Sequence, residues 1–222
     1  MPDRIATYSA GGKTFYGAVA DGGMIALSPD FPQWPTLREV VEANALETLV
    51  EAAKNRPVTH PDGAFQWEIP IPAPEKIVCV GVNFPDRNAE YKDGQAAPEN
   101  MSLFVRFARS FTGHDRPLIR PKVSEKLDYE GEIAIVIGKD GRHIPDAEAL
   151  DHIAALTICD EGTLRDWVRH AKFNVTQGKN FEQSGAMGPW LVPFRHHAQI
   201  TDARIVTRVN GETRQDDRTS RM

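Results

Sequence analysis

The sequence lacks any long apolar segment. No uninterrupted apolar run reaches the roughly 20 residues that a helix needs to cross a bilayer. The N-terminal segment MPDRIATYSAGGK also lacks the basic and then apolar order of a signal peptide. We therefore expect a soluble, cytoplasmic protein with no membrane partner.

Cysteine is scarce, and histidine and cysteine do not occur at the spacing of a zinc site. The two cysteines, Cys79 and Cys159, each lie inside an apolar run, where a free thiol packs like a small hydrophobic side chain. The pair His196-His197 stands alone, so it does not complete a ligand motif. We expect both thiols in the core, and a zinc site is disfavoured.

Two further absences narrow the class of protein. The net charge of -5 shows no excess of Lys and Arg for tracking phosphates, so nucleic acid is not an expected partner. The glycine fingerprint of a dinucleotide site is missing, and strands and helices do not alternate regularly. The hydrophobic fraction of 41% is nevertheless that of an ordinary folded protein with a sizeable core.

The N-terminal region predicts a small β meander followed by a helix. Thr36 and Glu39 have the spacing of a capping box, and apolar residues then keep helical spacing from Leu37 to Ala53 until Pro57 ends the pattern. We expect one amphipathic helix there. Short strand-like runs separated by glycine turns precede it, at Ile5–Tyr8, Thr14–Ala18 and Met24–Leu27.

A proline-rich stretch suggests a domain boundary near residue 70. Five prolines fall between residues 57 and 74, which excludes a helix interior. We expect a small N-terminal domain at 1–70 and a mainly β, α+β catalytic domain at 71–222 that continues beyond Met222. Its expected strands are Ile77–Val82, Leu103–Phe107, Ile133–Ile137, Ala154–Cys159 and Ile205–Val209, and its expected helices are Asp146–Ile153 and Leu164–His170.

Acidic residues at the ends of two apolar strands suggest a metal site. Glu130 and Glu132 are two residues apart in LDYEGEIAIVIGK, so both side chains point to one face of a strand that we expect to be buried on both sides. A second apolar strand, HIAALTICD, ends in Asp160. Three carboxylates suit a hard cation such as Mg²⁺ or Mn²⁺. By spacing alone, however, the E-x-E pattern is also typical of a solvated strand edge.

Several short blocks, taken together in order, resemble the fumarylacetoacetate hydrolase family. The similarity runs from Lys76 to Met222, and the preceding region resembles the small, variable lead domain of many members. The blocks are Gly81-Val82-Asn83-Phe84 with Glu90 downstream, Asp128-Tyr129-Glu130-Gly131-Glu132, Asp160 followed by Arg165-Asp166-Trp167, Gly178-Lys179-Asn180-Phe181, Gly188-Pro189-Trp190-Leu191-Val192, and Val209-Asn210-Gly211-Glu212.

This resemblance implies a fold, a metal and a set of site residues. The family fold is a mixed β-sandwich roll that usually forms homodimers, and its members bind Mg²⁺ or Mn²⁺. Glu130, Glu132 and Asp160 match the metal-binding carboxylates, and Lys179 matches a lysine beside the metal and the substrate oxygens. The implied activity is metal-dependent hydrolysis of a carbon–carbon bond in an acylpyruvate-like or β-keto diacid, as in aromatic catabolism.

One departure from the family pattern leaves the reaction open. Family hydrolases use a His–Glu pair as the general base; Glu90 matches the glutamate, but Arg87 occupies the histidine position. Arginine stays protonated and cannot accept a proton from water, so Glu90 would act alone while Arg87 pairs with it or holds a substrate carboxylate. A decarboxylase, a keto–enol isomerase and a non-hydrolytic keto-acid binding protein are the alternatives. Arg106 and Arg109 are candidate substrate-binding residues, although ordinary surface charge explains them equally well.

Overall fold

The computed structural model describes residues 3–84, 100–170 and 174–222. Strands dominate these residues, and the helices are short. This confirms the expected α+β, mainly β class. Within the described ranges, no helix has the length and apolar character needed to cross a bilayer.

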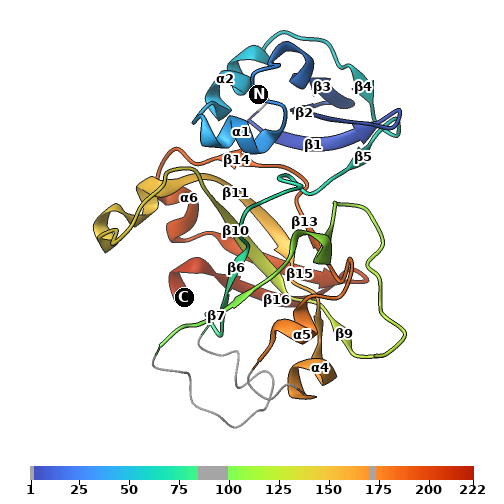
Figure 1. Cartoon of the computed structure of the whole chain (residues 1–222), viewed down its shortest axis with the longest axis vertical. Helices are drawn as coiled ribbons and strands as arrows, with labels where there is room; N and C mark the ends of the chain where they lie inside the picture. The colour runs from blue at the N-terminus through green and yellow to red at the C-terminus, as the bar shows by residue number, and fades with distance from the viewer. Residues whose placement is uncertain (1–2, 85–99, 171–173) are drawn as a thin grey trace.

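The N-terminal residues fold into an antiparallel sheet at one end of the molecule (Figure 1). The expected meander is confirmed: each of its first three strands pairs with the next. Gly11 and Gly12 form the first turn with φ values of 54° and 76°, a left-handed conformation that glycine adopts without strain. In the order β4-β3-β2-β1-β5, the strands are β1 (Ile5–Ala10), β2 (Lys13–Ala20), β3 (Gly23–Ala26), β4 (His60–Pro61) and β5 (Gln66–Trp67).

Two helices, not the single expected helix, cover this sheet: α1 (Leu37–Glu42) and α2 (Leu46–Ala52). The capping box is confirmed, because Thr36 accepts from the backbone of α1 and Glu39 bonds back to the Thr36 N–H. The helix stops because Asn44 takes a positive φ of 52°, a conformation that asparagine tolerates better than most residues. The apolar spacing continues across this break and therefore did not reveal it.

The larger region contains a second sheet and three strand pairs. All five apolar segments expected to form strands do so. The sheet has the order β10-β11-β13-β8, with β14 also on β11: β8 (Phe111–Thr112), β10 (Gly131–Ile137), β11 (Ile153–Asp160), β13 (Gly185–Met187) and β14 (Val192–Pro193). The pairs are β6 (Val78–Gly81) with β7 (Ser102–Val105), β9 (Leu127–Asp128) with β12 (Thr163–Leu164), and β15 (Arg204–Val209) with β16 (Glu212–Arg218).

Short helices connect these strands. The two helices expected here are present, the first as the 3-10 helix η3 (Asp146–His152) and the second as α4 (Arg165–His170). The described residues of this region also contain α5 (Thr176–Lys179), α6 (Ala198–Thr201) and the 3-10 helices η2 (Ala108–Ser110) and η4 (Thr219–Arg221), and the 3-10 helix η1 (Ser28–Asp30) follows β3 in the N-terminal region.

The two regions share one hydrophobic core. Ile5 of β1 pairs with Leu191, and both are fully buried with Ala155 of β11 in the cluster that includes the apolar faces of α1 and α2. Thr7 donates a hydrogen bond of 2.6 Å to the Pro70 carbonyl. The N-terminal sheet therefore packs directly on β11 and the segment before β14. The domain boundary near residue 70 stays a prediction.

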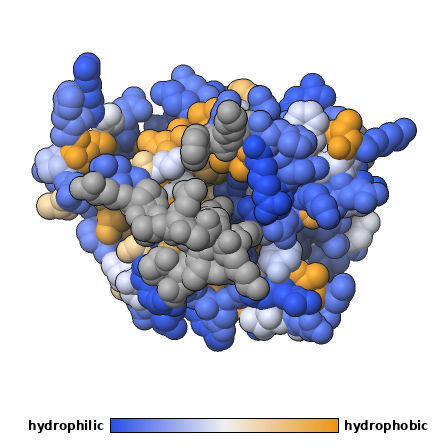
Figure 2. All heavy atoms as spheres, turned by 90° about the horizontal axis from the view of Figure 1, so that it is seen from below, coloured by the Kyte–Doolittle hydropathy of each residue, from blue (hydrophilic) through white to orange (hydrophobic). Residues whose placement is uncertain are grey.

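The outer face of the second sheet is only partly covered. Ile135 and Ile137 of β10 are 48% and 57% exposed, and Ile158 of β11 is 57% exposed. The expectation that β10 is covered on both sides was therefore wrong for this chain. Figure 2 shows apolar side chains reaching the surface on the face seen from below.

Candidate functional site

The pairing of β10 with β11 decides which side chains meet. Glu132 lies opposite Cys159, and the Glu161 N–H donates to the Glu130 carbonyl at 2.7 Å, which continues the register by one pair. Residues opposite each other in an antiparallel pair project to the same side. Glu130, Glu132, Cys159 and Glu161 therefore share one face of the sheet.

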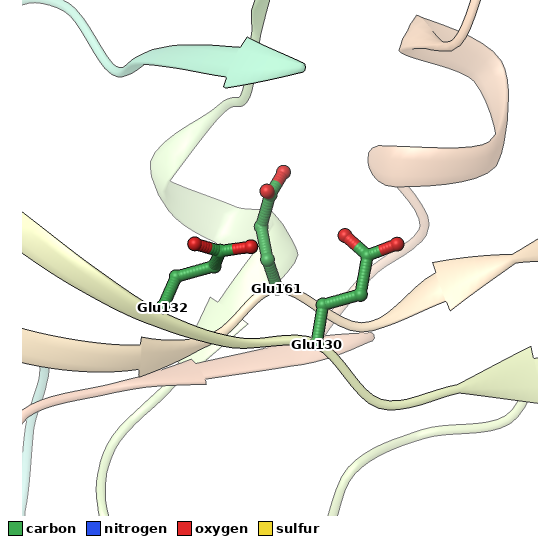
Figure 3. A group of neighbouring side chains, drawn as sticks. All are labelled: Glu130, Glu132 and Glu161. Carbon is green, nitrogen blue, oxygen red and sulfur yellow. The ribbon is translucent and has the colours of Figure 1, made fainter. Parts of the chain in front are cut away.

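Three carboxylates converge on this face. One oxygen from each of Glu130, Glu132 and Glu161 lies within 4.8 Å of the others. Figure 3 shows all three side chains pointing to the same side: Glu130 directly precedes β10, Glu132 lies at its beginning and Glu161 lies in the turn after β11. The predicted meeting of Glu130 and Glu132 is thus present in the structure.

Asp160 is not a member of this group. It lies opposite Gly131, one residue out of phase, so its side chain belongs to the other face of the strand. Its Oδ1 accepts a hydrogen bond of 2.9 Å from the Glu130 N–H and supports the backbone of β10. The structure brings Glu161 into the position expected for Asp160. Strand alternation places Asp160 and Glu161 on opposite faces, but only the register with β10 decides which of them joins Glu130.

The residue between the two glutamates is a glycine, Gly131, because β15 packs closely against this position. A Cβ at this position would lie 1.9 Å from the Thr207 Oγ1, and the Gly131 N–H donates to the Gln215 side chain at 3.1 Å. The β15–β16 hairpin therefore supports the back of β10 directly behind the carboxylates.

Lys179 lies among the carboxylates. It ends α5 and is 5% exposed; its Nζ donates to Glu130 and lies 3.3 Å from the Glu161 Oε1. Gly178 allows this approach, because a Cβ there would lie 2.5 Å from the Val168 Cγ2 on α4. The sequence GKN thus fixes a buried ammonium group inside an acidic cluster.

Arg165 holds Glu130 from the other side. Its Nη1 lies 2.6 Å from the Glu130 Oε1, while its Nε donates to Asp128 at 2.8 Å. Burial raises the pKa of Glu130, but Lys179 and Arg165 together outweigh burial and hold the pKa below its usual value. Glu130 is therefore ionised at neutral pH.

Glu161 experiences the opposite balance. Burial raises its pKa above the usual value, and the nearby Lys179 and Arg106 only partly offset this effect. Its Oε1 is buried and accepts no hydrogen bond from the described residues, although the Lys179 Nζ lies 3.3 Å away. The Lys179 ammonium is thus within ion-pair distance of this buried oxygen, but it only partly offsets the cost of burying the charge.

The donor set fits a hard divalent cation. Carboxylate oxygens are the ligands that Mg²⁺ and Mn²⁺ prefer. Glu130, Glu132 and Glu161 provide three such oxygens within reach of one ion.

Arg106 and Arg109 do not present free guanidinium groups to this site. Arg106 is 2% exposed and hydrogen-bonded to neighbouring segments. The Arg109 side chain is 92% exposed and lies 3.8 Å from Glu182. The structure thus places one arginine in the interior and the other on the surface. Arg87 and Glu90 lie outside the described residues.

The two cysteines lie beside the carboxylates. Burial raises the pKa of Cys79 to about 12 and that of Cys159 well above its usual value, and the nearby Glu161 adds to both shifts. Both are free, and both stay protonated thiols at neutral pH. Both residues are half-buried and belong to neither hydrophobic core cluster, so the expectation of core thiols was only partly met, and the sequence did not predict their position beside the acidic group.

The fold and this cluster define a member of a known enzyme family. A sequence model of the C-terminal domain of fumarylacetoacetate (FAA) hydrolase matches residues 76–222. The chain therefore belongs to the fumarylacetoacetate hydrolase family, as the sequence motifs predicted.

Named relatives show what related chains do. The chain is 32% identical over 206 residues to oxaloacetate tautomerase FAHD2A of Homo sapiens, covering 90% of this chain and 65% of the relative. It is 39% identical over 170 residues to oxaloacetate tautomerase YisK of Bacillus subtilis, covering 72% and 56%. The chain thus spans about two thirds or less of the length of these relatives.

Solved structures share the fold. Fumarylacetoacetate hydrolase from Exiguobacterium antarcticum superimposes with a TM-score of 0.80 at 27% identity, covering 99% of this chain and 76% of that one. A probable 2-hydroxyhepta-2,4-diene-1,7-dioate isomerase from Mycobacterium abscessus gives a TM-score of 0.75 at 25% identity, covering 99% and 75%.

Proposed function

We propose that this chain carries the active site of a keto–enol tautomerase that acts on a 2-keto diacid of the oxaloacetate type with Mg²⁺ or Mn²⁺. The observation that carries the proposal is the convergence of Glu130, Glu132 and Glu161 around the buried Lys179. Related chains named oxaloacetate tautomerases support the reaction and the substrate class.

The chemistry requires stabilisation of negative charge and transfer of one proton. Tautomerisation moves a proton between C3 and the C2 oxygen of the keto acid, and no carbon–carbon bond breaks. When bound, the divalent ion supplies a Lewis acid for the keto and carboxylate oxygens. Glu130, Glu132 and Glu161 would hold this ion, and Glu130 and Glu161 also pair with the buried Lys179.

Lys179 is the residue that we assign to the reacting oxygen. Its Nζ contacts Glu130 and Glu161 and lies 5.1 Å from the centroid of the Phe104 ring, so its position is fixed before substrate arrives. A preorganised ammonium group stabilises charge that develops in the transition state without having to reorient. In the keto-to-enol direction the ammonium group donates its proton to the C2 oxygen, and in the reverse direction the resulting neutral amine takes that proton back.

Tautomerisation makes fewer demands on this chain than hydrolysis does. Water attack requires a general base, and the family histidine position holds Arg87. Proton transfer within a keto acid requires no activated water. The departure at Arg87 is therefore compatible with a tautomerase.

The test is a direct assay of enol disappearance. Enol-form oxaloacetate is mixed with purified protein and its ultraviolet absorbance is followed, after treatment with EDTA and after restoring Mn²⁺ or Mg²⁺. We expect turnover only with metal, and a loss of about 100-fold or more in kcat for Lys179→Met. Lys54→Met, which removes an exposed lysine paired with Glu51 on α2, is the matched control. A parent protein with no metal-dependent enol loss would refute the proposal.

Hydrolysis is the second candidate, supported by the fold of the Exiguobacterium hydrolase at 27% identity. The same preparation is incubated with acylpyruvates, and release of pyruvate is measured; release from oxaloacetate would instead indicate decarboxylation. Arg87→His restores the family residue and is expected to raise acylpyruvate cleavage if the missing base is the only defect. Oxalate binding by calorimetry without any turnover would point to a keto-acid binding protein.

The remaining proposals concern the assembly and location of the chain. We propose a homodimer, a division near residue 70 and a cytoplasmic location. Sedimentation at several concentrations tests the dimer, and limited proteolysis tests the boundary. The human relative is named as mitochondrial, so fractionation of the source cells decides the location.

A further inference from the structure

Arg106 is a buried cation that the proposed reaction does not use. It follows β7, and its backbone N–H donates to the Ile77 carbonyl at 3.1 Å. The side chain is inaccessible to solvent, and the guanidinium lies 4.1 Å from the centroid of the Phe111 ring. A substrate anion cannot reach it in this position.

Four hydrogen bonds join this guanidinium to three separate segments. Its Nε donates to the Ser110 Oγ at 3.1 Å, and its Nη2 donates to the Ser110 carbonyl and the Ser184 Oγ, both at 3.2 Å. Its Nη1 donates to the Gly162 carbonyl at 3.3 Å. Arg106 therefore links η2, the turn after β11 and the segment before β13.

The turn after β11 carries Glu161, the residue next to Gly162. The same Nη1 that binds the Gly162 carbonyl lies 4.0 Å from the Glu161 Oε1, and an arginine has one N–H more than the four used above. This Oε1 is the Glu161 oxygen, described above, that has no hydrogen-bond donor among the described residues. The guanidinium thus fixes the backbone of this turn and places a permanent positive charge behind its carboxylate.

The segments around the guanidinium are packed too closely for side chains at Gly162 and Gly185. A Cβ on Gly162 would lie 1.8 Å from the Ser184 carbonyl oxygen, and a Cβ on Gly185 would lie 3.1 Å from both Nη atoms. Two glycines therefore allow the turn and the segment before β13 to close around one planar group. Lysine has neither the planar fork nor the number of donors to replace it.

We infer that Arg106 is a positioning residue for the metal site, which sets the place of Glu161 from behind and touches neither the ion nor the substrate. This inference rests on the proposed assignment of Glu161 as a ligand. It differs from the substrate-binding role that the sequence suggested for Arg106. It predicts an effect on metal affinity and kcat, with little effect on KM.

The test measures Mn²⁺ binding directly. Metal-free parent, Arg106→Met and Arg106→Lys proteins are titrated with Mn²⁺, and free Mn²⁺ is followed by electron paramagnetic resonance. Loss of a residue that orients a ligand typically weakens metal binding by about 10-fold to 100-fold, and we expect this range for Arg106→Met. Arg106→Lys should recover part of the loss, because it restores charge without the fork. Arg38→Met, which removes an exposed arginine 2.6 Å from Glu42, should bind Mn²⁺ as the parent does.

Further measurements separate positioning from folding and from catalysis. The circular dichroism of each metal-free variant shows whether it folds. If Arg106→Met does not fold, Ser184→Ala takes its place. This variant removes one of the hydrogen bonds to Arg106 and should weaken Mn²⁺ binding by a smaller factor. At saturating Mn²⁺, we expect kcat of Arg106→Met to fall while KM changes by less than about 2-fold. A folded Arg106→Met with parental Mn²⁺ affinity, or with raised KM and unchanged kcat, would overturn the inference. If Arg106→Met binds Mn²⁺ more weakly than the parent but the parent itself shows no turnover, the proposed function is refuted and the positioning role of Arg106 is not.

Discussion

Glu161 is held in surroundings that oppose its charge. Its side chain is 6% exposed, its pKa is raised by burial, and its Oε1 has no hydrogen-bond donor among the described residues. Glu130, a few ångströms away, has a lowered pKa because two basic side chains bind it. The site therefore combines one carboxylate whose charge is stabilised by two basic side chains that outweigh burial and one whose buried charge Lys179 offsets only in part.

Substitutions of Glu161 and Asp160 should show which of the two residues binds the metal. Glu161→Gln removes a proposed ligand and should weaken Mn²⁺ binding by about 10-fold or more, which calorimetry on metal-free protein measures. Asp160→Asn keeps an oxygen that accepts from the Glu130 N–H and should change the affinity by much less. The reverse order of the two effects would return the ligand role to Asp160.

The raised pKa of Glu161 also predicts how stability varies with pH. The pKa of a glutamate in the unfolded chain is about 4.3. A glutamate whose pKa is higher in the folded state contributes its full stabilisation at a pH below the unfolded-state pKa, and this contribution is lost as the pH rises through the folded-state pKa. As the pH rises toward neutrality, the free energy of unfolding of the metal-free parent should therefore fall relative to that of metal-free Glu161→Gln.

Urea unfolding in EDTA across this pH range measures the difference. The exposed Glu148→Gln provides a control and should follow the parent at every pH. A constant difference between the parent and Glu161→Gln would contradict the assignment of the effect to ionisation of Glu161.

The sequence identified most but not all of the residues in the acidic cluster. Glu130 and Glu132 were found because strand alternation fixes the relative direction of two residues on one strand. Asp160 was chosen over Glu161 because the register between two strands is not visible in either strand alone. The contact of Lys179 with Glu130 depends on Gly178 and α4, which only the folded chain brings together.

At the scale of elements, local signals gave the strands better than the helix ends. The longer strands β1, β2, β10, β11 and β15 contain enough alternating or apolar residues to be recognised. The two-residue strands β4, β5, β8, β9, β12 and β14 were not expected, because they are defined by the partner that each one meets. The break between α1 and α2 depends on one residue, Asn44, with a positive φ.

The capping box of α1 should make a measurable contribution to stability. Thr36 accepts from the Arg38 N–H at 3.2 Å, so Thr36→Ala should lower the free energy of unfolding by about 1 kcal/mol. Thr36→Ser keeps the acceptor and should lose little. Chemical denaturation of both variants tests this, and equal losses would show that the methyl group of Thr36 matters more than its hydroxyl group.

At the scale of the whole molecule, the sequence could not show which sheet faces are covered. β10 is apolar on both sides, but only its inner face meets the N-terminal core through Val136. Ile135 and Ile137 on the outer face stay substantially exposed, although their sequence pattern is that of a buried strand. Burial of a strand face depends on what packs against it, which periodicity does not specify.

Metal binding should stabilise the whole chain, because the three glutamates belong to two segments that the N-terminal sheet and the β15–β16 hairpin also support. A ligand that binds only the folded state raises the unfolding free energy by about 2.7 kcal/mol at 100 times its Kd. Thermal unfolding of the parent should therefore shift upward as Mn²⁺ increases and return with EDTA. Glu161→Gln should start from equal or higher stability without metal at pH 7, since its buried charge is gone, and should gain less from Mn²⁺. If both proteins gain equally, the ion binds elsewhere on the chain.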